Sequence, residues 1–336
     1  MSEERDRYLW DRSGEPDPEV QRLEALLGRH RLTVPSSGQP RPPPRRRWAL
    51  RGAIGLAAAA VACAAAIALL PRLGQPGTEW RVTSAGGASI GGVAFEGRGA
   101  LRVGEALETG AGSHAELHAG AVGKIEVAPG SLLRLVQSSS GRHRLTLERG
   151  RIAARLWSPP FTFGFSTPSA DAFDLGCAFS LEASGEQSAL HVSSGWVTLQ
   201  WGERQELIPA GASAIALRGR GPGTPVFDDA PGPFKAAVRS LDFGPPGDGR
   251  RIALETLLQV ARRRDVYTLL RLRLRAGSEE RDRIYTRASE LWPPPAGMTR
   301  EVFLEGDPDS TDPWVHSLGL GDAKRWWIHV RDVLPL

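Results

Sequence analysis

Cysteine is scarce in this chain of 336 residues, which contains only Cys63 and Cys177. No Cys/His pair has the spacing of zinc ligands, so we expect no metal ion or other cofactor. Cys63 lies in an apolar segment far from Cys177, so the two thiols are not expected to pair within one chain. The region around Cys177 must therefore be stable through its hydrophobic core alone.

Concentrated positive charge is also missing, apart from one short run. The formal net charge is +4, and arginine is spread along the chain. A nucleic-acid-binding protein would gather this charge on one face with interleaved aromatic residues, so we expect no direct contact with nucleic acid. The one dense run, Arg45–Arg47, abuts an apolar segment and is better explained by attraction to anionic lipid.

Long apolar runs are absent except for one, Gly52–Leu70, in which nineteen consecutive residues carry no charge. A helix of this length spans roughly 28 Å, close to the hydrocarbon thickness of a bilayer. Arg45–Arg47 and Arg51 precede it, whereas only Arg72 follows closely, which places the N-terminus in the cytoplasm. We therefore predict one transmembrane helix at 48–71 in a bacterial inner membrane, with most of the chain in the periplasm.

Two other interpretations of this segment stay open. Its alanine content also suits a buried helix of a soluble domain. The run Arg46-Arg47-Trp48-Ala49-Leu50 resembles a twin-arginine signal, so the segment could instead be a cleaved signal peptide.

The first 47 residues form a short polar head, too small to bury a core of its own. Asp17-Pro18-Glu19 is typical of a helix start, and apolar residues follow at helical spacing. Val34–Pro44 is a stiff proline-rich spacer. The head either folds against a cytoplasmic partner or is a loosely structured tail. The expected partner-binding side chains are Tyr8, Trp10, Val20, Leu23, Leu26 and Leu27.

Residues 80–218 have the pattern of an all-β domain. Short alternating runs are separated by Gly and Pro at intervals of roughly 8–12 residues. Examples are 115–118, 124–127, 132–136, 144–147, 151–156, 161–165, 178–181, 189–192 and 196–201. We predict a β-roll, sandwich or barrel, so that the whole chain is multidomain and mainly β.

The pattern changes again after a predicted linker at 219–233. Residues 234–336 are expected to form a separate α-helical C-terminal region, because apolar residues recur at helical spacing from Ile252 to Leu274. A further helix is predicted at Ser278–Trp292. The arginines of this region are expected to form solvated faces, namely Arg262, Arg263, Arg264, Arg271, Arg273 and Arg275.

Several blocks between Gly99 and Leu217 resemble the extracytoplasmic FecR domain of FecR-type transmembrane regulators. In order, these blocks are 103–109 (VGEALET), 115–117 (AEL), 127–135 (VAPGSLLRL), 147–152 (LERGRI), 160–163 (PFTF), 166–169 (STPS), 175–181 (LGCAFSL), 195–197 (GWV) and 209–211 (PAG). The resemblance covers a little over a third of the chain.

This resemblance implies a periplasmic β domain behind one membrane helix, and a small cytoplasmic segment that controls an extracytoplasmic-function sigma factor. Known members receive their signal from an outer-membrane transporter. The present chain differs in two places: its head has Trp10 as its only tryptophan before the arginine run, and its C-terminal region is helical.

The motifs that suggest catalysis do not have the context that catalysis needs. His114, Glu116 and His118 would share one face of a strand, whereas a zinc motif of this kind needs a helix. Gly87–Gly91 matches the letters of a nucleophile elbow but is followed by a strand-like run. Cys177 lies in an apolar block, and the pairs Asp171/Asp174 and Asp228/Asp229 fall in loop or linker. We therefore expect that the protein is not an enzyme and has no catalytic residue.

Two functions remain. The first is a single-pass signalling regulator, in which a periplasmic or outer-membrane protein or ligand changes how the head holds a cytoplasmic partner such as a sigma factor. One helix transmits little by itself, so dimerisation, altered docking or proteolysis near the membrane would carry the signal. The alternative is a membrane-anchored periplasmic binding or scaffold module with no signalling role.

Overall fold

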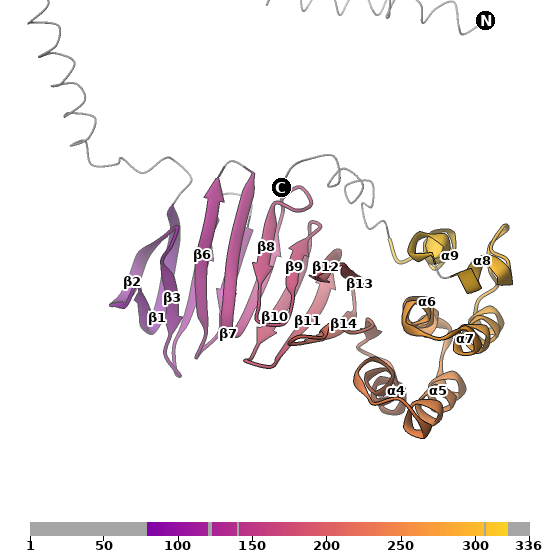
Figure 1. Ribbon diagram of the computed structural model, residues 1–336. Coiled ribbons are helices and arrows are strands. Elements are labelled where there is room, and N and C mark those ends of the chain that lie inside the picture. The colour runs from indigo at the N-terminus through magenta and orange to yellow at the C-terminus, as the bar shows by residue number, and fades with distance from the viewer. Residues whose placement is uncertain (1–78, 120–122, 140, 306, 322–336) are drawn as a thin grey trace, which may run out of the picture. The chain divides into compact units, whose positions relative to one another are not determined.

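The computed structural model describes residues 79–119, 123–139, 141–305 and 307–321 (Figure 1). The predicted head, spacer and membrane helix lie outside these residues. Within the described residues, no helix combines the length and apolar character needed to cross a bilayer. The described residues all belong to one compact unit.

The larger part of the described chain is a β body, drawn in indigo to rose in Figure 1. Its strands are β1 (Glu79–Ile90), β2 (Val93–Arg102), β3 (Ala106–Thr109), β4 (His114–His118), β5 (Gly123–Val127), β6 (Leu132–Ser139), β7 (Arg142–Leu156), β8 (Phe163–Ser166), β9 (Asp171–Asp174), β10 (Ala178–Ala183), β11 (Gln187–Ser194), β12 (Trp196–Trp201), β13 (Arg204–Pro209), β14 (Ala212–Leu217), β15 (Gly221–Pro222) and β16 (Val226–Phe227). Described neighbours pair antiparallel, except that β7 and β8 run parallel.

The strands form two rows that share β7. They are also joined through β1, which pairs with β3 beside β6 and with β4 beside β5. Residues 142–149 of β7 pair with β6 and β8, and this row continues through β9 and β12 to β13. Residues 150–156 of the same strand pair with β5 and β10, and this second row continues through β11 to β14. The runs predicted at 144–147 and 151–156 are therefore one long strand that bends at Gly150, where φ is +93°.

Alternating burial along β7 shows why the two rows stay together. Leu145 and Leu147 of its first half are fully buried, as are Ile152 and, nearly so, Ala154 of its second half. Their side chains belong to one continuous apolar core that also includes residues of the C-terminal helices. Burial of this shared core is the main force that stabilises the body.

The C-terminal part of the described chain is helical. Its elements are α4 (Gly232–Phe243), α5 (Asp248–Val260), η1 (Arg263–Asp265), α6 (Val266–Leu272), η2 (Arg273–Arg275), α7 (Ser278–Leu291), α8 (Arg300–Glu305), η3 (Pro308–Thr311) and α9 (Asp312–Ser317). The helix predicted at Ser278–Trp292 corresponds to α7. A mainly β body followed by a helical C-terminal part is thus confirmed.

The stretch expected to be a linker is part of the sheet. β15 and β16 both pair with β14, and Phe227 of β16 is fully buried. The Thr268 hydroxyl of α6 donates to the Pro225 carbonyl at 2.8 Å. The helices therefore pack directly on the last strands.

Candidate functional site

The helix α6 covers the outer edge of β13, which is the last strand of its row. The Tyr267 hydroxyl donates to the Leu207 carbonyl at 2.6 Å, and Arg271 Nη2 donates to the Gln205 carbonyl at 3.1 Å. An uncovered edge strand presents unpaired backbone groups to other chains. Here side chains of α6 occupy two of those groups.

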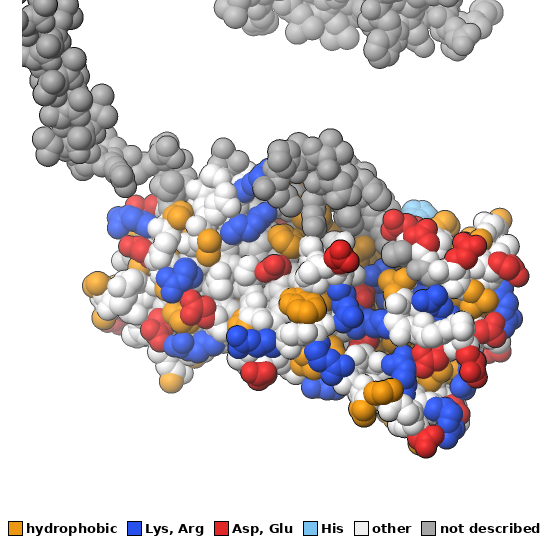
Figure 2. Space-filling model, in the orientation of Figure 1, with side chains coloured by type: hydrophobic (Ala, Val, Ile, Leu, Met, Phe, Trp, Pro, Cys, Tyr) orange, Lys and Arg blue, Asp and Glu red, His pale blue; other side chains and the backbone are white. Residues whose placement is uncertain are grey.

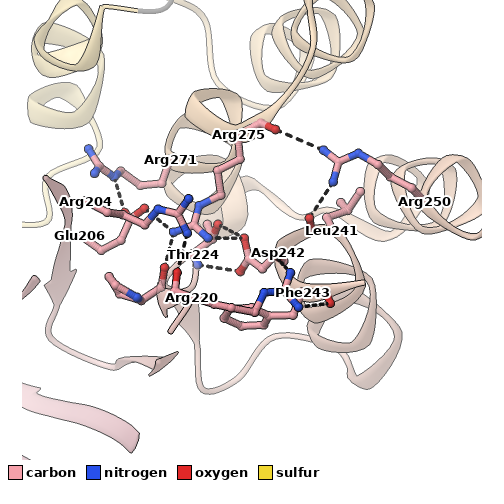
Figure 3. Close-up of polar contacts among 11 residues, drawn as sticks. Arg204, Glu206, Arg220, Thr224, Leu241, Asp242, Phe243, Arg250, Arg271 and Arg275 are labelled. Carbon is pink, nitrogen blue, oxygen red and sulfur yellow. Dashed lines mark hydrogen bonds and ion pairs between the residues drawn. The ribbon is translucent and has the colours of Figure 1, made fainter. Parts of the chain in front are cut away.

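A buried network of charged side chains fixes this junction (Figure 3). Glu206 of β13, whose side chain is only 3% exposed, accepts from Arg271 Nε and lies 2.9 Å from Arg275 Nη2. Arg275 also pairs with Asp242 of α4 at 3.1 Å. Strand β13 and the helical elements α4, α6 and η2 are thus held together by charges that have little access to water.

Burial of these side chains disfavours their charged forms, and the ion pairs between them offset this cost. Burial acts to lower the pKa of Arg271. The raising effects, of which the charge of Glu206 is the largest, prevail, so this pKa lies above the usual arginine value. Burial raises the pKa of Asp242 above the usual aspartate value, although Arg275 and Thr224 act to lower it. Removal of one member would leave its partners buried and uncompensated, which is strongly destabilising.

Further hydrogen bonds hold the carboxylate of Asp242 and the side chain of Arg250. The Thr224 N–H donates to Asp242 Oδ2 and its hydroxyl to Oδ1, both at 2.7 Å. Arg250 donates twice to Glu280 at 2.8 Å and once to the Leu241 carbonyl at 2.7 Å. These groups of α4, α5 and α7 are therefore already arranged before any ligand arrives.

Beside this network lies a cleft of about 890 Å³. Its lining residues are Glu203, Arg204, Gln205, Glu206, Leu207, Arg220, Leu241, Asp242, Gly244, Pro246, Arg250, Arg271, Leu274, Arg275, Asp309 and Asp312. The volume lies within the range of ligand sites, although the lining is more polar than usual. Its paired carboxylates and guanidinium groups suit recognition of a polar ligand.

The arginines of the C-terminal region do not form the solvated faces expected from the sequence. Arg273 is fully buried and donates to the carbonyls of Phe303 and Asp307, and burial lowers its pKa to about 10. Arg271 and Arg275 belong to the network described above. The expectation is wrong for these three residues because their acceptors come from distant segments.

Arg262, Arg263 and Arg264, in and just before η1, remain partly exposed but still contact other side chains. Arg262 pairs with Asp265 at 2.9 Å and with Asp229 at 3.3 Å. Arg263 lies over the Trp292 ring at 4.1 Å. These contacts tie η1 to the β16–α4 connection and to Trp292, the residue that follows α7.

The residues predicted to bind a cytoplasmic partner, from Tyr8 to Leu27, lie outside the described residues. Their role stays a prediction.

The histidine pair considered for a metal lies on β4, as a strand. Glu116 contacts His118 at 2.8 Å and Lys124 at 2.5 Å, in a partly exposed charge ladder. No group of three ligating side chains with a metal-like arrangement occurs in the part of the chain that the structure describes.

The other singled-out residues also have structural partners. Cys177 is buried and its thiol contacts Asp174. Asp228 pairs with His191 at 2.9 Å, and Asp229 pairs with Arg262 and Arg264 at 3.3 Å. Gly87–Gly91 lies at the end of β1 and its turn, not before a helix.

The blocks that resemble the FecR domain specify how the strands are fastened. Thr109 Oγ1 accepts from the Ser131 N–H at 3.0 Å and donates to the Ala128 carbonyl at 2.7 Å. Ser131 Oγ in turn accepts from the Arg151 N–H at 3.0 Å. A Cβ on Gly150 would lie 2.2 Å from this oxygen, so glycine is required there. These block residues join strands, and the cleft is built from other residues.

No family model and no curated protein matches this chain. Two crystal structures of a putative anti-sigma factor from Parabacteroides distasonis ATCC 8503 are similar to 39% of it, with 19% sequence identity and a TM-score of 0.32. The similarity covers 63% and 62% of those chains, so this chain spans less than two thirds of each.

Proposed function

We propose that this protein is a membrane-anchored regulator of the FecR type that binds partners and performs no catalysis. Its β–α body would bind a protein or ligand outside the cytoplasm, and its head would bind a sigma factor. One observation carries the proposal: the FecR-like blocks fall along the strands and turns of a single β body, and their polar residues and glycines fasten those strands.

The junction of β body and helices supports a sensory role for this body. Its cleft is lined by strand and helix residues that one buried network connects. If the strand wall and the helix wall of the cleft can adopt two relative arrangements, a ligand that binds one arrangement more tightly would increase the population of that arrangement. The signal to the head would then pass through the segment that precedes β1.

The head is tested by co-purification. The full chain is isolated in detergent from its own host, and bound proteins are identified by mass spectrometry. We expect a sigma factor with the unchanged chain, and its loss with the double variant Leu23→Asp, Leu27→Asp, because two charges would interrupt the apolar stripe.

The matched control is Gln21→Asp, Ala25→Asp, which places the same charges off the stripe. Recovery of no transcription factor with the unchanged chain, or equal loss with both double variants, would count against the proposal.

The second candidate is an anchored binding module with no signalling role. Trp201 is 43% exposed and lies opposite the cleft-lining Arg204 in the β12–β13 hairpin, and such an aromatic residue favours a ligand site that needs no head. Deletion of residues 1–47 separates the two functions: a module keeps its function in the envelope without the head, and a regulator loses transcriptional control.

A further inference from the structure

Two guanidinium groups of the cleft are not neutralised by carboxylates. Arg204 Nη1 donates to the Arg220 carbonyl at 2.7 Å, and Arg220 donates to the carbonyls of Phe243 and Asp242 at 2.7 and 3.3 Å. Among the residues that the structure describes, neither arginine forms an ion pair, and both are exposed. By contrast, Arg250, Arg271 and Arg275 are each paired with a carboxylate.

The backbone contacts of these two arginines hold them in place. Arg220 closes the carbonyl end of α4 and lies over the Phe243 ring at 5.3 Å (Figure 3). A guanidinium that is already oriented loses less freedom when it binds an anion, and its planar donors match a carboxylate. Both guanidinium groups are therefore already oriented, and Arg220 also caps the helix.

An aromatic ring lies beside the pair. Trp201 is directly opposite Arg204 in the β12–β13 hairpin, so the two side chains share one face of the sheet. The ring packs on Gly221, where a Cβ would come within 2.9 Å of it. Because Trp201 is still 43% exposed, part of this fixed ring is open to solvent. Figure 2 shows basic side chains next to apolar ones where the last strands meet the helices.

Hydrogen-bond acceptors complete the cleft. The carboxylates of Glu203 and Asp309 line it, are exposed, and form no ion pair with any side chain in the described ranges. The ligand should therefore carry both an anionic group and several hydrogen-bond donors. A flat apolar face would complement the tryptophan.

An extended peptide fits this site less well. Peptides that bind sheet edges gain affinity from backbone hydrogen bonds to the open strand. The outward carbonyls of Gln205 and Leu207 on β13 already accept from Arg271 and Tyr267. Recognition here depends on side chains.

We propose that the cleft binds an acidic saccharide. Arg204 and Arg220 hold its carboxylate, Trp201 stacks on the apolar face of a sugar ring, and Glu203 and Asp309 accept from its hydroxyl groups. This binding does not depend on the head or on a sigma factor, so it can fail or succeed independently of the proposed function.

The test is calorimetry on the full chain in detergent, with trigalacturonic acid as the probe. We expect saturable binding that weakens more than about tenfold for Trp201→Ala and for Arg204→Ala, since each removes a direct contact. The methyl ester of the same trisaccharide, which lacks the negative charges, should also bind more than about tenfold more weakly.

The control variants change residues of the same type as Trp201 and Arg204 that are also exposed but lie elsewhere. Trp157→Ala removes a tryptophan that is 66% exposed elsewhere on the body, and Arg98→Ala removes an exposed arginine of β2. Both should leave the affinity unchanged. Arg204→Gln, with thermal melting of every variant, excludes a loss of binding caused by misfolding.

Three results would overturn the proposal. These are no binding of trigalacturonic acid at millimolar concentration, equal affinity for the acid and its ester, and binding of a hexaglutamate peptide in place of the saccharide. The last result would identify the partner as an acidic peptide.

Discussion

At the residue scale, Gly150 shows how one position joins the two rows of strands. Its φ of +93° is a conformation that side chains resist, and the atom nearest to an added Cβ would be Ser131 Oγ at 2.2 Å. The same serine oxygen accepts from the Arg151 N–H, so it has little freedom to move away. Backbone strain and a steric clash therefore coincide at this glycine.

We expect Gly150→Ala to lower the free energy of unfolding by roughly 3 kcal/mol or more, the sum of a left-handed penalty and overpacking. Gly97→Ala is the control, because Gly97 also has a positive φ of +81° but nothing lies within 4 Å of an added Cβ. Its loss should be only about 1–2 kcal/mol. Urea denaturation measures both, and equal losses would show that the contact with Ser131 is unimportant.

Asp174 is one residue through which pH acts on the β body. Its carboxylate accepts from Ser158 and Cys177, but burial dominates and raises its pKa from 3.8 to about 6. Between these two values the folded chain holds a proton that the unfolded chain has released. The contribution of Asp174 to stability therefore falls as pH rises from about 4 to 6, by roughly 3 kcal/mol in all.

The variant Asp174→Asn removes this titration while it keeps an oxygen acceptor. Its stability relative to the unchanged protein should increase by roughly 3 kcal/mol between pH 4 and pH 7. Unfolding free energies at several pH values measure the difference, with Asp171→Asn at the other end of β9 as the control for loss of one carboxylate. A difference that is constant with pH would contradict the argument.

At the scale of elements, the alternation of Arg and Leu over 271–275 explains why sequence reasoning failed there. Local spacing cannot tell a solvated arginine from a buried one whose acceptor lies far away in the chain. For Arg271 the acceptor is Glu206, 65 residues earlier. A second difficulty was β13 itself, because Arg204 and Glu206 interrupt the apolar alternation that marks a strand.

We expect Glu206→Ala to destabilise the fold by about 3–5 kcal/mol, because Arg271 and Arg275 would remain buried without their shared carboxylate. Glu255→Ala is the control, since Glu255 forms an exposed pair with Arg251 at 3.1 Å. Loss of such a surface pair should cost less than about 1 kcal/mol. Comparable losses in urea denaturation would mean that the network does not hold α6 to β13.

At the scale of the whole molecule, the broad division into β body and helical part followed from periodicity, since each pattern extends over many residues. The joining of the two parts did not follow, because it depends on contacts such as Tyr267 to Leu207, which are 60 residues apart. The Gly- and Pro-rich composition of 219–233 suits a linker and equally suits the short strands β15 and β16. The cleft, which exists only where the parts meet, was therefore beyond sequence reasoning.

The final prediction concerns a chain that ends at Pro231 and so lacks every helix from α4 onward. It would expose the β13 edge, leave Glu206 without its arginines, and uncover the Trp196 ring that now packs 5.9 Å from that of Tyr267. Exposed strand edges beside apolar surface lead to association between chains. We therefore expect this chain to form oligomers or aggregates in size-exclusion chromatography with light scattering. A chain that ends at Gly321 keeps α4 to α9 and is the control, which should elute as the unchanged protein does. A monodisperse chain ending at Pro231 with a cooperative melt would restore the helical part as an independent domain, and the cleft would then lie between two separable units.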